Sequence, residues 1–394
     1  MSDLNERVQE ITINMGPSHP AMHGTIRLLL TLVGEKVVKC DTQIGYLHRA
    51  FEKMCEANIW QAIFPYTDRL NYVSPLMNNV GYAQAVERLI GIDVPERTKY
   101  IRVLLCELSR IADHLTCIAA ASMELGAFTV FLYCMEARDL IWDRIEELTG
   151  ARVTPAYVRI GGLARDLPEG FNERVCSILP KIEKVISEVD GLLTNNPIFI
   201  DRMRGTGIIS SKDAIEIGFT GPCLRATGVN HDLRKRQPYL IYDRLEFEVP
   251  VGSRGDNYDR YMVRMEEMRQ SIKIIRQVIK DMPDGKINIE NTMYILPPKE
   301  EVYNTIEGVV NHFKLIIDGI QVPKGEIYDA TEAANGELGF YLVSDGSGRP
   351  VKCRVRSPSF ALMQGLEKMV VGGYLADVIP TFGSINMIGG ECDR

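Results

Sequence analysis

The chain has 394 residues, of which 45% are apolar and 25% are charged, and its net charge is −7 at pH 7. This length suffices for two or three domains, and the acidic balance excludes a general role in nucleic-acid binding. The N-terminus lacks the apolar core of a signal peptide. No run reaches the roughly 18 to 20 apolar residues of a membrane span. We therefore expect a soluble or peripheral protein in the cytoplasm.

Motifs for a bound metal or nucleotide are missing from the sequence. The nine cysteines form no C-x-x-C pair, and neither a P-loop nor an H-E-x-x-H motif occurs. Scattered cysteines of odd number argue against a disulfide framework or a zinc site. We expect buried, reduced thiols, and a chain that binds no metal or flavin of its own.

The stretch from Gly16 to Gly24 carries two histidines, His19 and His23, in a segment rich in proline and glycine. Pro20 keeps His19 away from helical backbone angles, so we expect a loop. Strands are expected after it, at 25–33 and 36–40. The loop either directs two imidazoles into a cavity or binds them to backbone in a turn. Taken alone, the stretch favours the second interpretation, because two histidines without partners do not make a site.

Apolar residues recur at helical spacing through most of the chain. We expect Pro65 to end the first helix and Gly150 to cap the fourth. Helices this long and apolar need one another to bury their stripes, so we expect an antiparallel bundle at the centre. The expected helices cover residues 50–63, 78–90, 101–118, 128–148, 172–193 and 257–282.

Short β elements are expected around this bundle. Residues 239–251 alternate like a strand, and 339–343 and 351–355 flank a turn-rich link. The tail at 358–379 is expected to be helical, with a break at Gly372-Gly373. The predicted fold class is mainly α with peripheral β (α+β). Residues 1–45 form an N-terminal β-hairpin region with the histidine loop. Residues 46–394 form a helical core with small β elements, and the whole is one continuous unit.

Charged residues fall on a helix with a broad apolar face. Arg102, Glu107, Arg110 and Asp113 all lie within the predicted helix at 101–118. A solvated face explains most charges of this kind. Others would lie in buried, ion-paired chains, which need close partners to offset the cost of desolvation.

Seven runs of sequence resemble one protein family, in order and over nearly the whole chain. The family is that of the 49-kilodalton or D subunit of respiratory complex I, the proton-pumping NADH-quinone oxidoreductase. It is similar to the large subunit of nickel-iron hydrogenases, which implies a hydrogenase-like fold. The runs are N-M-G-P-S-H-P-A-M-H-G, I-G-Y-L-H-R-A-F-E-K, Y-T-D-R-L-N-Y-V-S-P, E-L-S-R-I-A-D-H-L, Y-V-R-I-G-G, R-A-T-G-V-N-H-D-L-R-K and G-G-E-C-D-R.

The hydrogenase metal ligands have no counterpart here. By resemblance, the four cysteine positions of the two ligand motifs fall on Asn71, Ser74, Ile388 and Glu391, and Cys392 is displaced by one residue. Asparagine, serine and isoleucine cannot supply the thiolates that a soft metal site requires. The resemblance therefore implies that the metal centre is lost and that its cavity takes a quinone headgroup.

The resemblance also assigns roles to individual residues. His23 and Tyr72 would donate to the two quinone oxygens, because an imidazole and a phenol can each supply a proton. His19 and Glu124 would support this site, with Glu124 in place of the aspartate that partners the histidine in relatives. Arg49 and Arg69 would lie near an iron–sulfur cluster of a neighbouring subunit.

One position departs from the family pattern. Thr154 stands where many relatives carry a histidine near the cluster, which removes a group that titrates near neutral pH. A cluster of lower potential, suited to menaquinone, is a hypothesis that agrees with this change.

The implied function is that of a quinone-binding component, active only within its complex, whose chemistry drives proton translocation elsewhere. Ubiquinone or menaquinone is the expected substrate. The expected partners are the iron–sulfur B subunit, the C and I subunits of the peripheral arm, and the membrane-arm H subunit at the quinone entry. The expected location is the cytoplasmic side of the inner membrane. Two alternatives stay open: a hydrogenase-type large subunit of a related membrane complex, and a non-catalytic scaffold.

Overall fold

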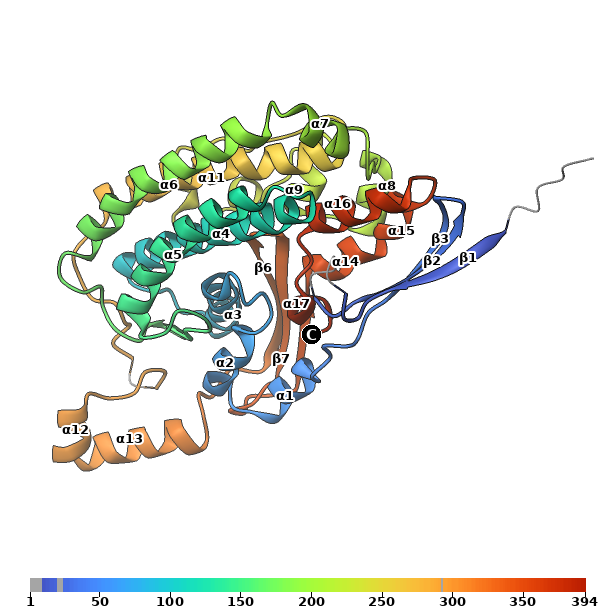
Figure 1. The fold of residues 1–394 in the computed structure, drawn as a ribbon. Coiled ribbons are helices and arrows are strands. Elements are labelled where there is room, and N and C mark those ends of the chain that lie inside the picture. The colour runs from blue at the N-terminus through green and yellow to red at the C-terminus, as the bar shows by residue number, and fades with distance from the viewer. Residues whose placement is uncertain (1–8, 20–23, 292) are drawn as a thin grey trace, which may run out of the picture.

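The computed structural model describes residues 9–19, 24–291 and 293–394. Long helices dominate this part of the chain, and three small antiparallel sheets lie at their margins (Figure 1). The predicted fold class, mainly α with peripheral β, is confirmed. None of the helices among the described residues is long and apolar enough to cross a membrane.

Four long helices form the central layer, as predicted: α4 (Glu96–Glu124), α5 (Phe128–Thr149), α6 (Phe171–Leu193) and α11 (Asn257–Asp281). α4 packs against α5, α11 and the C-terminal helix α16 (Leu375–Ile385), so it lies at the centre of the molecule. α4 extends past the predicted range at both ends, from the residue after Pro95 to Glu124. Gly150 caps α5 with a left-handed φ of 84°, as expected.

The N-terminal region is a three-stranded sheet of β1 (Glu10–Met15), β2 (Arg27–Val33) and β3 (Lys36–Gln43), in that order. The two predicted strands are present, and β1 adds a third strand. Leu28, Leu30 and Leu32 alternate inward along β2. They share a core with residues of α15 (Leu366–Val370) and α16. The boundary predicted at residue 45 stays a prediction.

The C-terminal sheet holds β6 (Gly325–Ala333), β7 (Gly336–Ser344) and β8 (Lys352–Arg356), and it packs against α3 (Pro75–Ile90). The predicted strands at 339–343 and 351–355 are confirmed within β7 and β8, whereas β6 was missed. The tail is helical, and Gly372 breaks it with a φ of 88°. The remaining elements are β4 (Val158–Arg159), β5 (Gly162–Leu163), α7 (Pro197–Met203), α8 (Ser211–Ile217), α9 (Gly221–Arg225), α10 (Leu233–Arg236), α12 (Lys299–Asn304), α13 (Ile306–Ile317), α14 (Pro358–Gln364) and α17 (Gly389–Cys392).

Two predicted elements are wrong. Residues 239–251 form no strand but an irregular segment with one 3-10 turn, η2 (Tyr242–Arg244). Its alternation arises because Tyr239, Ile241, Leu245 and Phe247 enter the core without a neighbouring strand. The helix expected at 50–63 divides into α1 (Phe51–Ala57) and η1 (Trp60–Ile63). Pro65 lies in the first turn of the next helix, α2 (Phe64–Thr67), where a missing N–H costs nothing, so it begins a helix instead of ending one.

Candidate functional site

One buried carboxylate joins segments that are far apart in the sequence. Asp113, on α4, accepts hydrogen bonds at Oδ2 from Asn71 Nδ2 and Ser74 Oγ, each at 2.8 Å. Its other oxygen, Oδ1, accepts one from Asn386 Nδ2 at 2.6 Å. Asp113 has no exposed surface. Asn71 and Ser74, two of the four positions that the resemblance aligns with hydrogenase cysteines, are therefore engaged with a carboxylate of this chain.

A cavity of about 240 Å³ lies beside this carboxylate. It is enclosed by the segment before α3, one side of α4 and the chain that follows α16, and Ile388 lies in its wall. The lining is mainly apolar with a few polar groups, which is typical of a small-molecule site. Its lining includes Tyr72, Thr116, Cys117, Phe382 and Asn386.

Tyr72 lies at the edge of the cavity with 38% of its surface exposed. Burial raises the pKa of its hydroxyl above the usual value. Arg49 opposes this shift and Asp113 adds to it. The hydroxyl therefore keeps its proton at neutral pH. It forms no hydrogen bond within the described part of the chain, so it can donate to a ligand.

The histidine loop is described only in part. His23 lies outside the described residues, and the next residue, Gly24, lines the cavity. His19 follows β1 and is half-buried. Glu124, at the end of α4, lies directly behind the cavity wall: a Cβ added to Gly383, which lines the cavity, would meet Glu124 Oε2 at 2.2 Å. The roles of these residues stay predictions.

Arg49 and Arg69, predicted to lie near the partner's cluster, lie side by side. Arg49 Nη2 donates to the backbone oxygens of Arg69 at 3.2 Å and Gly390 at 3.1 Å, and Arg69 donates to the backbone oxygen of Pro65. Both arginines line a second cavity, of about 400 Å³. Burial lowers the pKa of Arg49, and the positive charge of Arg69 adds to this shift while Asp393 opposes it. Arg49 and Arg69 therefore place two cations side by side, and we call this region the arginine surface.

The segment around Thr154 lies beside these arginines. Thr154 has a left-handed φ of 57°. Two residues further on, the backbone N–H of Ala156 donates to Asp68, the neighbour of Arg69. Burial raises the pKa of Asp68 to about 6. Thr154 is thus on the arginine side of the molecule.

The other two positions that the resemblance aligns with hydrogenase cysteines, Ile388 and Glu391, lie in or next to α17. Ile388 lines the 240 Å³ cavity, and Glu391 is fully buried. Glu391 Oε1 accepts from the backbone N–H of Ser359 at 3.0 Å, and burial raises its pKa to about 7. Burial also raises the pKa of the Cys392 thiol, to about 12, so that it stays protonated. Among residues 9–19, 24–291 and 293–394, no group of three histidine, cysteine or acidic side chains could hold a metal.

The solvated face expected for most charges of the helix at 101–118 is wrong, because Arg102, Glu107, Arg110 and Asp113 are all fully buried. The alternative of buried, ion-paired chains is confirmed by an ionic cluster between α4 and α11. Glu267 on α11 lies 3.2 Å from Arg110 of α4, 3.0 Å from Arg225 and 3.0 Å from Arg234. None of these side chains is more than 1% exposed. Burial alone would raise the pKa of Glu267, but the arginines, Arg225 foremost, hold it well below its usual range. The cluster fixes α4 against α11.

Comparison with known proteins agrees with this geometry. Residues 124–394 match the model of a family described as respiratory-chain NADH dehydrogenase, 49 Kd subunit. The D subunit of the NADH-quinone oxidoreductase of Myxococcus xanthus (strain DK1622) is 57% identical over 392 residues, covering 100% of this chain and 94% of the relative. The corresponding D 1 subunit of Sorangium cellulosum (strain So ce56) is 56% identical over 394 residues, covering 100% and 98%.

A third relative bears a double name. The C/D subunit of the NADH-quinone oxidoreductase of Bdellovibrio bacteriovorus is 52% identical over 391 residues, which is 99% of this chain but 70% of the relative. The resemblance stated from the seven sequence runs is confirmed. The chain belongs to the family of the 49-kilodalton or D subunit of the respiratory-chain NADH-quinone oxidoreductase.

Proposed function

We propose that this chain forms one wall of a quinone-reduction chamber in a complex I-type assembly. The observation that carries the proposal is the Tyr72 hydroxyl, which keeps its proton and lies at the edge of a small, mainly apolar cavity. Arg49 lies close enough to Tyr72 to affect the pKa of its hydroxyl. A headgroup in the cavity would therefore lie beside a proton donor, with a cationic residue nearby.

Reduction of a quinone to a quinol takes two electrons and two protons, and each carbonyl oxygen becomes a hydroxyl. Tyr72 would donate to one oxygen and the His23 imidazole to the other, with His19 and Glu124 in support. The electrons would come from an iron–sulfur cluster of a neighbouring subunit. Arg49 and Arg69 would favour the reduced cluster electrostatically. Thr154 in place of histidine would leave the cluster potential less dependent on pH.

The quinol-forming step would drive proton translocation in the membrane arm. The proposed neighbours are the cluster-bearing B subunit, the C and I subunits, and the H subunit at the quinone entry. The double name of the Bdellovibrio relative supports the C subunit as a neighbour. The assembly would place this chain as a peripheral protein on the cytoplasmic side of the inner membrane.

Two observations weigh against a hydrogenase-type role. Asn71 and Ser74 both donate to Asp113, and Ile388 has no atom that could bind a metal. Three of the four positions that would carry metal-binding thiolates in a hydrogenase therefore have other contacts here. A pure scaffold would need neither a free phenol nor a cavity at this place. The relation to hydrogenases stays an expectation about ancestry and fold.

The proposal is tested on the purified native assembly. Donor oxidation is measured with ubiquinone and menaquinone analogues and with an artificial electron acceptor that reacts before the quinone site. We expect quinone-dependent turnover that a quinone-site competitor abolishes, while oxidation with the artificial acceptor continues. Turnover with the artificial acceptor alone, and none with any quinone, would contradict the proposal.

A further inference from the structure

The outer face of α13 is apolar and turned away from the rest of the chain. Its exposed residues recur three and four positions apart and so lie on one side of the helix. Ile306 is 80% exposed and Phe313 63%. In Figure 1, α12 and α13 project from the lower edge of the molecule, away from the central helices. A contiguous exposed apolar stripe is typical of an interaction site. It consists of Ile306, Val309, Val310, Phe313, Ile316 and Ile317.

The opposite side of α13 contacts the rest of the chain at a few points. Leu315 is buried in the main core, and its backbone oxygen accepts from Gln61 Nε2 at 3.3 Å. Gln61 Oε1 accepts from the backbone N–H of Ile320 at 3.1 Å, just beyond the helix. Thr305 caps the helix through a bond from the Gly308 N–H at 3.0 Å. The exposed stripe is therefore not a core face that failed to pack.

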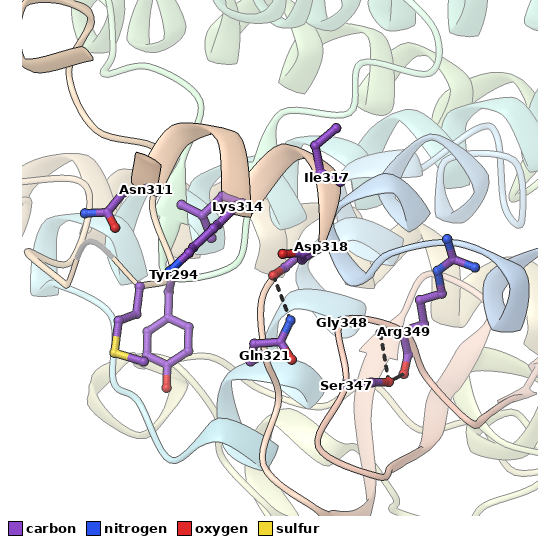
Figure 2. Close-up of a pocket in the computed structure, with 12 residues that line it drawn as sticks. Tyr294, Asn311, Lys314, Ile317, Asp318, Gln321, Ser347, Gly348 and Arg349 are labelled. Carbon is purple, nitrogen blue, oxygen red and sulfur yellow. Dashed lines mark hydrogen bonds between the residues drawn. The ribbon is translucent and has the colours of Figure 1, made fainter. Parts of the chain in front are cut away.

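The flank of α13 nearer the C-terminal sheet carries a different surface. A cavity of about 780 Å³ separates the helix from the turn at 347–349. Figure 2 shows Lys314, Asp318, Gln321 and Arg349 around it. Ile317 of the stripe lines the same cavity, so this polar flank begins at the edge of the stripe.

The stripe leads to the arginine surface. A cavity of about 570 Å³ is lined by Leu315 and Ile316 at one end and by Pro65 and Arg159 at the other. Pro65 also lines the 400 Å³ cavity that contains Arg49 and Arg69. The two cavities share Pro65, so the end of the stripe and the three arginines line neighbouring cavities.

Charge on this surface defines the partner. Arg49, Arg69 and Arg159 donate only to backbone oxygens within the described chain, and none of them forms an ion pair there. A complementary partner would present an apolar patch to α13 and an anionic centre to the arginines. An iron–sulfur cluster held by cysteine thiolates is such a centre. The arginines line cavities, which favours an inserted centre over the flat surface of a membrane.

We propose that the stripe on α13 docks the same neighbouring subunit that carries the iron–sulfur cluster. This inference rests on the proposed function, which supplies the cluster-bearing neighbour. The stripe would form the apolar anchor of the interface, and the arginines would face the cluster. α13 thereby fixes the distance between the cluster and the quinone cavity.

Photo-crosslinking in the purified assembly tests this contact. A benzoyl-phenylalanine is placed at position 313 of the tagged full-length chain, and the crosslinked product is identified by peptide mass. We expect the cluster-bearing subunit in that product. The same probe at position 215 serves as control, because Ile215 on α8 is 58% exposed and lies far from α13 in Figure 1. A product with any other component of the assembly, with lipid or with a second copy of this chain would overturn the proposal.

Charge substitution gives an independent readout. In the double variant Phe313→Glu and Ile317→Glu, we expect at least about a tenfold loss of the cluster-bearing subunit from the purified assembly, or 1.4 kcal/mol of binding. The circular dichroism of the chain should not change, because both side chains are exposed. Ile215→Glu should retain the cluster-bearing neighbour. Full retention in the double variant would overturn the docking proposal. It would leave quinone reduction untouched, so the two proposals fail separately.

Discussion

At the scale of single residues, Asp113 organises the candidate site. Sequence reasoning recognised it only as a charge on an apolar helix. Its partners Asn71, Ser74 and Asn386 lie up to 273 positions away, so only the fold shows that they meet. The sequence contains no local signal for this role, because Arg110 lies three residues before Asp113 and offers an ordinary helical ion pair. Tyr72, in contrast, was predicted through family resemblance, and the structure places it at a cavity.

Asp113→Asn should disturb the geometry of the cavity. The substitution replaces an acceptor oxygen with a donor, which opposes either Asn386 or the pair Asn71 and Ser74. A buried group without its partner costs about 1–3 kcal/mol. We expect a rise in the KM for quinone and a fall in kcat, with artificial-acceptor activity retained. Asp93→Asn, at an exposed position, is the control. Unchanged quinone kinetics in an assembled Asp113→Asn complex would show that Asp113 does not contribute to the site.

Glu391 makes stability depend on pH. Its pKa rises from 4.5 to about 7 on burial, so the folded chain holds this proton more tightly than the unfolded chain. Its contribution to stability therefore falls as the pH rises from 4.5 through 7, by about 3 kcal/mol in all. The free energy of unfolding of the full-length chain is measured with urea at pH 5 and pH 8. Between these two pH values it should fall less for Glu391→Gln than for the unsubstituted chain. Identical losses would show that the carboxyl is not protonated at pH 5 in the fold.

At the scale of elements, periodicity located the long helices and failed where tertiary packing decides. The helices α5, α6 and α11 begin and end within two residues of their predicted bounds. The strand predicted at 239–251 fails because its inward residues pack around the ionic cluster: Tyr242 donates to Glu107 at 2.6 Å. The alternating pattern in the sequence therefore indicated which residues are buried, although these residues form no hydrogen-bonded ladder with another strand. The prediction that Pro65 ends a helix was wrong for a local reason, because proline suits the first turn of a helix as well as its end.

Glu267 should be a main stabilising contact between α4 and α11. Glu267→Gln leaves Arg110, Arg225 and Arg234 with one carboxylate fewer in a site without water contact. Removal of one member of a buried ion pair costs about 3–5 kcal/mol. The neighbouring Glu266→Gln is a matched control, because its pair with Arg269 is solvent-accessible and worth at most about 1 kcal/mol. Equal free energies of unfolding for the two variants would contradict a structural role of the cluster.

At the scale of the whole molecule, the C-terminal residues are bonded to the segment that follows β3. Asp393 accepts from the backbone N–H groups of Gly45 at 2.9 Å and Leu47 at 2.8 Å. The last helix, α17, lies between Arg49 and the 240 Å³ cavity, because the backbone oxygen of Gly390 accepts from Arg49 and Ile388 lines that cavity. Sequence patterns predicted a helical tail and an N-terminal β region. They could not show that these regions share one core, because that contact spans more than 300 positions and leaves no local periodicity.

The central claim is that Tyr72 donates a proton to a quinone in the cavity, and Tyr72→Phe tests it most directly. This change removes one oxygen and keeps the ring. Quinone reduction by the assembled complex is measured beside artificial-acceptor activity and the cluster signals. Tyr133→Phe, with 36% exposure against 38% for Tyr72, is the matched control. We predict that quinone reduction falls by about 10² to 10⁴ in Tyr72→Phe alone, the usual effect of losing a positioned proton donor. Near-normal quinone turnover in a fully assembled Tyr72→Phe complex would contradict the claim.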